Sequence, residues 1–220
     1  MKTDSEFCEM VTCAGVYAAK WNTLQIMEKC IGSNVQGDFV ECGVMAGAHP
    51  AIMLYMLQKV GMRNRKVHLF DSFQGIPRAT ENDCPDVQKT YGLKQGKMET
   101  SGASACTVQE VTDNLKKWGV WDENMVVFHK GWFEDTLAQD ADKIDKIAFL
   151  RSDVDLYEST KLVYQHLYHK VVSGGFVCDD DIGLPGFPPA CRVAMEEVIG
   201  KKTDWIHIVG HETTAWRWVE

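Results

Sequence analysis

The sequence predicts an α/β protein with a doubly wound, mostly parallel sheet, and three observations predict it. Short apolar runs without polar alternation recur along the chain, as in strands buried on both faces of a parallel sheet. Segments with apolar residues at helical spacing separate these runs, which is the alternation of right-handed β-α-β units. The last two runs follow one another across a short turn, which predicts an antiparallel hairpin. We therefore expect five parallel strands followed by a C-terminal hairpin.

The individual elements follow from these patterns. The parallel strands are expected, in chain order, at residues 38–42, 66–71, 125–129, 146–150 and 175–178. The helices between and after them are expected at residues 51–60, 108–118, 158–171 and 189–199, with the hairpin strands at 205–209 and 215–219. A parallel sheet that ends in a hairpin is the outline of the class I methyltransferase (Rossmann-like) fold, whereas dehydrogenase-type Rossmann domains continue with further β-α units.

Two segments lie outside this alternation. Residues 1–34 contain a helical pattern from Glu6 to Ile31, and we expect this N-terminal segment to cover an edge of the sheet. Residues 74–106 are poor in large apolar side chains and rich in Gly, Lys, Thr and Ser. A stretch this long inside a compact domain is usually a functional lid or disordered, and its position after the second strand favours a substrate-covering lid. No linker divides the 220 residues, so we expect a single domain.

Charge and composition exclude several classes of protein. The chain carries 31 acidic against 23 basic side chains, a formal net charge of -8, which disfavours broad nucleic-acid or membrane binding. No apolar stretch approaches the roughly 18 residues of a membrane span, and the N-terminus lacks a secretory signal pattern. The eight cysteines include no CxxC spacing, so we expect free thiols and a cytoplasmic protein.

Ligands of open α/β sheets bind at the carboxyl ends of the strands, so the residues that end each apolar run carry the chemistry. The first strand ends in an ExGxxxG pattern formed by Glu41, Gly43 and Gly47, not in the GxGxxG of a dinucleotide site. An acidic residue beside a glycine turn suits a ligand that carries an ammonium group. The second strand ends in Asp71, which could accept both ribose hydroxyls or act with Ser72 as a turn or helix-capping residue; we favour ribose.

Five carboxylates follow two further strands. They belong to Asp153, Asp155, Asp179, Asp180 and Asp181. Carboxylates gathered at neighbouring strand ends repel one another unless a positive group lies among them, and Mg²⁺ prefers oxygen ligands of this kind. A single aspartate here could be explained as a helix N-cap, but five favour a divalent-metal site.

Six motifs, in order, resemble the macrocin O-methyltransferase family. They are GDFVECGV (37–44), HLFDSFQGIPR (68–78), KGWFEDTL (130–137), DVDLYEST (153–160), GGFV with the following aspartate pair (174–181) and PACR (189–192). Members of this family methylate hydroxyls of deoxysugars and related groups with S-adenosylmethionine and Mg²⁺. This chain differs from the usual pattern in having Met45-Ala46 after the first strand and Val154 between the two aspartates.

The resemblance implies a role for individual residues. The metal ligands fall on Asp153, Asp180 and Asp181, and the proposed general base falls on Asp153. The cosubstrate contacts fall on the turns after the first three strands, that is, on Glu41, Gly43, Gly47, Asp71, Ser72, Gly131 and Trp132. Trp132 could border an adenine ring, and His129 is a weaker candidate for the base. The resemblance also implies a homodimer.

These observations predict an S-adenosylmethionine- and Mg²⁺-dependent O-methyltransferase that acts on a sugar hydroxyl, of deoxyhexose or rhamnose type, in a glycan or glycosylated natural product. Three alternatives stay open. The hydroxyl could belong to a non-sugar acceptor. Asp153-Val-Asp155 could be the DxD diphosphate clamp of a metal-dependent glycosyltransferase, although Glu41 and the terminal hairpin argue against it. A non-catalytic nucleotide- or metal-binding module is the third.

Overall fold

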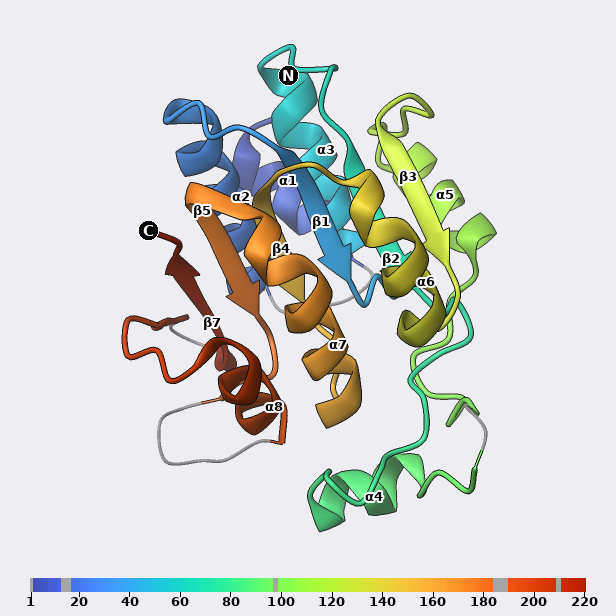
Figure 1. Cartoon of the computed structure of the whole chain (residues 1–220). Coiled ribbons are helices and arrows are strands. Elements are labelled where there is room, and N and C mark those ends of the chain that lie inside the picture. The colour runs from blue at the N-terminus through green and yellow to red at the C-terminus, as the bar shows by residue number, and fades with distance from the viewer. Residues whose placement is uncertain (1, 13–16, 97–98, 184–189, 209–210) are drawn as a thin grey trace.

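The computed structural model describes residues 2–12, 17–96, 99–183, 190–208 and 211–220. Its centre is a seven-stranded sheet with the strand order β3-β2-β1-β4-β5-β7-β6 (Figure 1). The strands are β1 (Asp38–Cys42), β2 (Val67–Asp71), β3 (Val126–Lys130), β4 (Ile147–Ser152), β5 (Val171–Asp179), β6 (Ile206–Ile208) and β7 (His211–Trp218). The five expected parallel strands and the C-terminal hairpin are thereby confirmed.

The strand order brings the ends of β1, β2, β4 and β5 to one edge of the sheet. β1 pairs in parallel with both β2 and β4, and β4 pairs in parallel with β5. β7 then pairs antiparallel with β5, and β6 lies beyond it. The chain reverses its direction of winding at β1 and β4, and ligands of open sheets bind at such a switch point.

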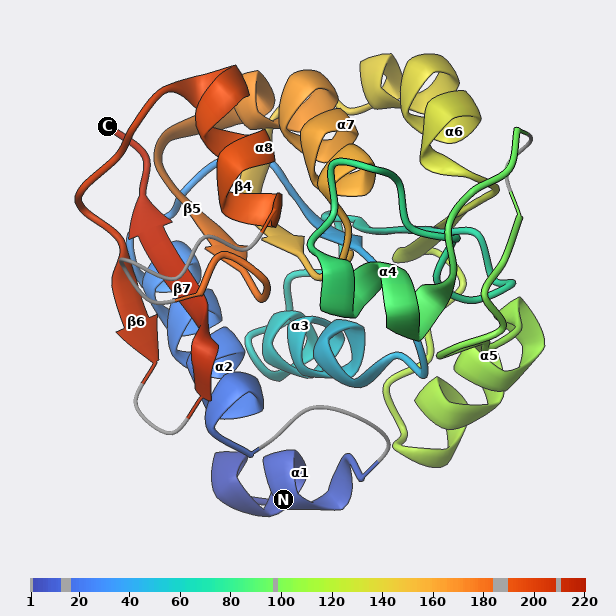
Figure 2. The same cartoon turned by 90° about the horizontal axis from the view of Figure 1, so that it is seen from below.

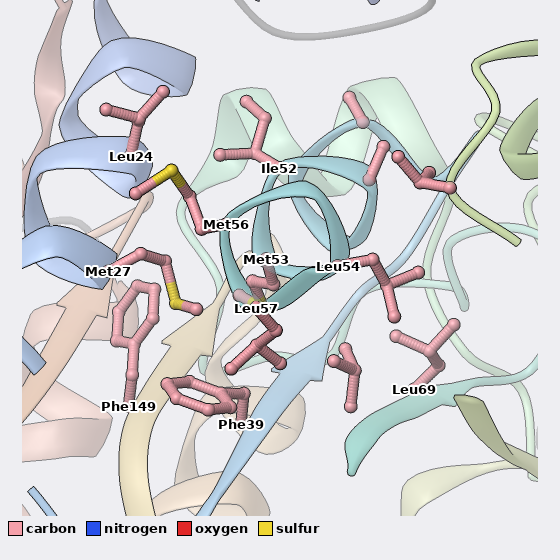
Figure 3. Close-up of a cluster of buried hydrophobic side chains, with 14 of the residues drawn as sticks. Leu24, Met27, Phe39, Ile52, Met53, Leu54, Met56, Leu57, Leu69 and Phe149 are labelled. Atoms are coloured by element: carbon pink, nitrogen blue, oxygen red, sulfur yellow. The ribbon is translucent and has the colours of Figure 1, made fainter. Parts of the chain in front are cut away.

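Two layers of helices cover the two faces of the sheet (Figure 1). One layer consists of α1 (Asp4–Met10), α2 (Tyr17–Gly32), α3 (Ala48–Lys59) and α5 (Val108–Lys117). The other consists of α6 (Phe133–Asp140), α7 (Tyr157–Leu167) and α8 (Ala190–Ile199). Successive strand residues point to opposite faces, so Phe39 packs in the first layer's core and Val40 in the second's. Figure 3 shows Phe39 and Phe149 below Met27 of α2 and Leu57 of α3.

Several expected boundaries differ from the structure, and the largest differences are at β5 and β7, which begin four residues earlier than expected, at Val171 and His211. The helix expected at 158–171 ends at Leu167, and a 3₁₀ turn (Tyr168–Lys170) leads into β5 at Val171. β5 is therefore longer than the expected 175–178. Gly174, with φ of +84°, interrupts the apolar pattern in the middle of this strand, and for that reason the sequence suggested a later start.

Two helices were not expected. α4 (Pro85–Tyr91) lies in the segment 74–106 and buries none of its residues, so it shows no apolar stripe. α6 buries only Thr136 and Leu137, again too little to give a clear period. Of the expected elements, Pro189 and Val209 fall outside the described residues.

The segment 74–106, which we call the lid segment, crosses the carboxyl edge of the sheet. Figure 1 shows α4 beyond the strand ends, and Figure 2, seen from below, shows it in front of that edge. Isolated bridges join Pro77 to Thr100 and Ala79 to Leu93 within it. The seven cysteines in the described ranges are free thiols. No helix in the described part of the chain is both long and apolar enough to cross a bilayer.

Candidate active site at the carboxyl edge of the sheet

The glycine turn after β1 is fixed by its contact with the end of β4. Gly43 has φ of +81°, and a Cβ there would lie 1.7 Å from the carbonyl oxygen of Asp153. The Asp153 N–H donates to the carbonyl of Cys42 at 3.0 Å. Gly47, at φ +86°, is the N-cap residue of α3, and a Cβ there would lie 3.0 Å from Cγ1 of the Val111 side chain. Gly43 is therefore required by its close approach to the backbone of Asp153, and Gly47 by its left-handed conformation beside Val111.

Asp71 ties the turns after β1 and β2 together. Its Oδ2 accepts hydrogen bonds from the N–H groups of Val44 (2.7 Å) and Met45 (3.3 Å), and its Oδ1 accepts one from Phe73 N–H (2.7 Å). A carboxylate offers about four acceptor positions, so these three bonds leave room for a ligand hydroxyl. Ser72 caps its own turn by donating to the Gly75 carbonyl at 3.0 Å.

A buried arginine lies among the carboxylates. The Arg151 side chain is 2% exposed, and its guanidinium contacts Glu41 Oε1 (2.9 Å), Asp153 Oδ2 (3.0 Å) and Asp180 Oδ1 (2.9 Å). One positive charge thus serves three acidic groups. Arg151 is thus a compensating cation in addition to the expected metal, and its sequence signal is a charged residue at the end of a buried apolar strand.

Glu41 keeps one oxygen unused. Its Oε2 is buried and has no hydrogen-bond partner among the described residues. Burial raises the pKa of Glu41 to about 8, against the lowering effect of Arg151. A buried carboxylate oxygen without a donor is a position where a ligand ammonium would be favourable.

Asp153, Asp180 and Asp181 each bring one carboxylate oxygen within 4.8 Å of the other two. The backbone orients them. Asp181 Oδ2 accepts from the N–H groups of Val154 (2.9 Å) and Asp155 (2.8 Å), and Thr214 Oγ1 donates to Asp180 Oδ1 at 2.7 Å. Three partly exposed carboxylates in this arrangement match the hard oxygen donors that Mg²⁺ or Mn²⁺ prefers. We call these three residues the aspartate triad.

The other two aspartates of the sequence cluster lie outside the triad. Asp179 is buried, accepts a hydrogen bond from the Tyr164 hydroxyl (2.9 Å) and also accepts one from the Asp181 N–H (3.0 Å). Asp155 has left-handed backbone geometry, with φ of +63°, and lines the adjacent cavity. Asp179 is thus a structural residue, whereas Asp155 is available to a ligand.

The crowding of carboxylates raises their pKa values. Burial, followed by the charges of Asp153 and Asp180, raises the pKa of Asp155 to about 7. Burial raises the pKa of Asp179 to about 6, even with the hydrogen bonds from Asp181 N–H and Tyr164. The pKa of Asp181 is also raised, first by burial and then by Asp153. Without a cation, simultaneous ionisation of all these carboxyl groups is therefore unfavourable.

Two cavities meet at this edge. The larger, of about 210 Å³, is lined by the ends of β1, β2 and β4, by the lid segment and by the start of α6. Its lining includes Gly43, Asp71, Ser72, Trp132 and Asp153. The smaller, of about 150 Å³, is lined by Glu41, His49, Arg151 and Asp180 and shares Gly43, Met45 and Asp153 with the larger one. Most of the expected cosubstrate residues thus surround adjoining cavities.

The remaining candidates have different positions. Trp132 and Phe133 line the larger cavity, and the sequence analysis missed Phe133. Gly131 shapes the turn before them, and its N–H donates to the Asp71 carbonyl at 3.0 Å. His129 is 4% exposed, and its ring nitrogens contact Asp140 (2.8 Å) and His68 (3.0 Å). It is not available as a base at the cavity.

Comparisons with known proteins agree with this geometry. A family model described as macrocin-O-methyltransferase (TylF) matches residues 16–217. The chain is 38% identical over 180 residues to demethyldecarbamoylnovobiocin O-methyltransferase of Streptomyces niveus. This alignment covers 82% of this chain and 64% of the relative. The chain is 32% identical over 199 residues to mycinamicin III 3''-O-methyltransferase of Micromonospora griseorubida, with 89% and 74% covered. This chain therefore spans slightly less than two thirds of the first relative's length.

Solved structures give the same result. The O-methyltransferase NovP superposes with a TM-score of 0.77 at 32% identity, over 92% of this chain and 80% of that one. The calicheamicin methyltransferase CalS11 superposes with a TM-score of 0.67 at 20% identity, over 98% and 90%, which is a likeness of fold. From the family match, the identities and the shared fold, we conclude that this chain belongs to the macrocin O-methyltransferase family.

Proposed function

We propose that this chain transfers a methyl group from S-adenosylmethionine to a sugar hydroxyl of a glycosylated small molecule, with Mg²⁺ bound by the aspartate triad. The observation that carries the proposal is the triad itself, which adjoins a cavity lined by the glycine turn after β1 and by Asp71. The names of the relatives support a sugar acceptor, since one is a mycinamicin III 3''-O-methyltransferase and another is an 8-demethyl-8-(2,3-dimethoxy-alpha-L-rhamnosyl)-tetracenomycin-C 4'-O-methyltransferase.

The two cavities fit the two ends of the cosubstrate. Glu41 Oε2, buried and without a partner in the described part of the chain, suits the ammonium of the methionine portion in the smaller cavity. Asp71 retains acceptor capacity for a ribose hydroxyl in the larger cavity, where Trp132 offers an aromatic face for the adenine. Gly43 lies in the wall that both cavities share. The cosubstrate would then pass beside Asp153.

The aspartate triad fits a divalent cation, and the Arg151 guanidinium helps to hold two of its carboxylates together. The guanidinium offsets part of the repulsion between Asp153 and Asp180, and backbone N–H groups hold Asp181. A divalent cation held there would lower the pKa of an acceptor hydroxyl and favour its ionised form. The triad and the cavity walls supply the alignment of the acceptor with the methyl group.

Two aspartates, Asp153 and Asp155, are candidates for the proton acceptor. Asp153 already has Oδ2 against Arg151 and contributes to the triad. Asp155 lines the same cavity and lies outside the triad, so a cation bound by the triad does not occupy its carboxylate. We therefore favour Asp155 as the proton acceptor and keep Asp153 as a cation ligand.

The larger cavity also restricts the acceptor. Ile76 and Pro77 of the lid segment face Trp132 and Phe133 across it, and these apolar groups would exclude water from the methyl group. Since the lid residues line the cavity, they are the part of the chain that would distinguish a sugar from a phenolic acceptor.

An assay of methyl transfer to a panel of rhamnose-type glycosides and phenols tests the proposal. We expect methylation of a sugar hydroxyl that stops when EDTA removes divalent cations and returns with Mg²⁺. Thermal-shift measurements give a second test, in which S-adenosylhomocysteine stabilises the protein and a UDP-sugar does not. Stabilisation by the UDP-sugar alone would contradict the proposal and favour a glycosyltransferase. The homodimer and the cytoplasmic location stay predictions.

A further inference from the structure

Asp83 is a buried acidic residue of the lid segment. It is only 3% exposed, although the residues on both sides of it are exposed. Its Oδ2 accepts hydrogen bonds from the N–H (2.7 Å) and hydroxyl (3.1 Å) of Thr80. Its Oδ1 accepts a hydrogen bond from the N–H of Tyr157 at 2.8 Å. A carboxylate of the lid is thus bound to the first residue of α7.

This contact replaces a helix cap that the local sequence lacks. The N-cap residue of α7 is Leu156, whose side chain cannot accept a hydrogen bond, so the first N–H groups need another partner. Asp83 supplies both an acceptor and a negative charge at the positive end of the helix. The cap of α7 therefore comes from a segment 74 residues earlier in the chain.

The start of α7 is also the end of the loop that carries Asp153. Within this loop, Asp181 of the triad holds the N–H groups of Val154 and Asp155, and Asp83 holds the N–H of Tyr157. The triad and the lid therefore bind peptide N–H groups that lie two residues apart, at Asp155 and Tyr157. A change in the position of either will alter the other through at most a few backbone torsions.

Two further contacts join the lid to the same region. Asn82 Nδ2 donates to Glu158 Oε1 at 3.1 Å in the first turn of α7. The Tyr91 hydroxyl, at the end of α4, hydrogen-bonds the Asp155 side chain. The lid thus contacts α7 and its preceding loop at three successive places, and only the contact through Asp83 is buried.

We propose that Asp83 is a positioning residue that couples the lid to the cation site: the closed lid fixes the loop 153–156, and a bound cation in turn holds the lid closed. The inference rests on the proposed function, because it assumes that the aspartate triad binds a divalent cation. Coupling of this kind is reciprocal, so loss of the lid contact must weaken cation binding by the same factor by which the cation stabilises the lid contact.

The test compares Asp83→Asn with Asp86→Asn, an exposed aspartate in the first turn of α4. In Asp83→Asn the amide group faces an N–H that formerly had an acceptor, so either Thr80 or Tyr157 loses its partner. We measure Mn²⁺ binding by calorimetry, S-adenosylhomocysteine binding, and tryptic cleavage at Lys89 of the lid with and without Mn²⁺.

We expect the Mn²⁺ dissociation constant of Asp83→Asn to rise by about three- to tenfold, within the usual range of coupling between sites. Its S-adenosylhomocysteine affinity stays unchanged, and Mn²⁺ no longer protects Lys89 from trypsin. Asp86→Asn behaves as wild type in all three measurements. A purely structural role of Asp83 would leave cation affinity unchanged in the folded protein.

Two results would overturn the inference, and they are distinguishable. If wild type binds Mn²⁺ and Asp83→Asn binds it equally well, the coupling is refuted and the proposed function stands. If wild type binds no divalent cation, the proposed metal role fails and the coupling fails with it. Should Asp83→Asn not fold, the wild type still tests the coupling, because a bound cation must protect the lid; tryptic cleavage at Lys89 that is equally fast with and without bound Mn²⁺ would also refute it.

Discussion

Two polar networks lie in this sheet, and they differ in whether their hydrogen bonds are complete. The first, which we call the histidine chain, runs from Asp38 at the start of β1 through His68 and His129 to Asp140 at the end of α6. The second is the aspartate triad with Arg151 and Glu41, at the carboxyl ends of β1, β4 and β5.

Each ring nitrogen in the histidine chain has a contact within it. Its contacts are 3.4 Å from Asp38 to His68, 3.0 Å between the two rings and 2.8 Å from His129 to Asp140. His129 also stacks on Phe70, with ring centroids 3.9 Å apart. The ring nitrogens of His68 and His129 are all taken up by these contacts and are not left for a ligand.

The triad has more acceptors than donors. Arg151 serves Glu41, Asp153 and Asp180 at once, and Glu41 Oε2 has no partner within the described residues. The comparison shows that burial of charged groups does not by itself identify a functional site. A functional site is indicated instead by hydrogen-bond acceptors that outnumber the donors beside a cavity, because a bound ligand can supply the missing donors or positive charge. The following predictions test this difference.

The largest effect is expected from Arg151→Met. Removal of the guanidinium leaves Glu41, Asp153 and Asp180 without their shared positive charge, and breaking a buried ion pair in this way costs about 3–5 kcal/mol. Urea denaturation measures the free energy of unfolding. As a control, Arg63→Met removes a surface pair with Asp122 and should cost less than about 1 kcal/mol. Equal costs for the two variants would show that Arg151 does not hold the cluster together.

Asp153→Asn is expected to lower kcat by at least about 100-fold, because it removes a ligand oxygen at a site that stabilises developing charge. Binding of S-adenosylhomocysteine stays unchanged, whereas Mn²⁺ binding weakens.

Asp155→Asn should lower kcat to a similar extent but retain Mn²⁺ binding, since Asp155 lies outside the triad. The exposed Asp142→Asn serves as the control. Full activity in Asp153→Asn would refute its assignment.

His129→Phe should lower the stability of the protein without changing its Mn²⁺ affinity or its kcat. It leaves His68 Nδ1 without its ring partner and removes one partner of Asp140, which costs about 1–3 kcal/mol of stability. Mn²⁺ affinity and kcat at a temperature well below the unfolding transition stay as in wild type. The exposed His169→Ala should change neither. A loss of Mn²⁺ binding in His129→Phe would mean that the two networks are not independent.

The smallest effect is a pH dependence of stabilisation by Mg²⁺. The pKa values of Asp155 and Asp179 are raised to about 7 and about 6. Their contribution to stability is therefore fully present below the unfolded-state pKa and is lost as the pH rises through these folded values. Mg²⁺ offsets the repulsion between the ionised groups, so it should raise Tm by a few °C more at about pH 8 than at about pH 5.5. An equal or larger rise at the lower pH would contradict the account.

Much of the fold could be predicted from the sequence, because apolar runs such as those around Phe39 and Phe149 are buried on both faces and show no alternation. The short helices could not, since α4 buries no side chain and leaves no period to detect. A cluster of five carboxylates was predicted because acidic residues that end adjacent strands meet at one edge of the sheet, and the family resemblance singled out Asp153, Asp180 and Asp181 among them. No role was predicted for Arg151, because its partners come from three different elements. None was predicted for Asp83, because its partner Tyr157 lies in a helix far along the chain.

The most direct test of the central claim is an anomalous diffraction measurement at the manganese edge on crystals grown with Mn²⁺ and S-adenosylhomocysteine. We predict one strong peak at about 2.0–2.3 Å from oxygens of Asp153, Asp180 and Asp181, beside the larger cavity. A peak elsewhere, or no peak at a Mn²⁺ concentration that supports activity, would contradict the assignment of this cluster as the cation site.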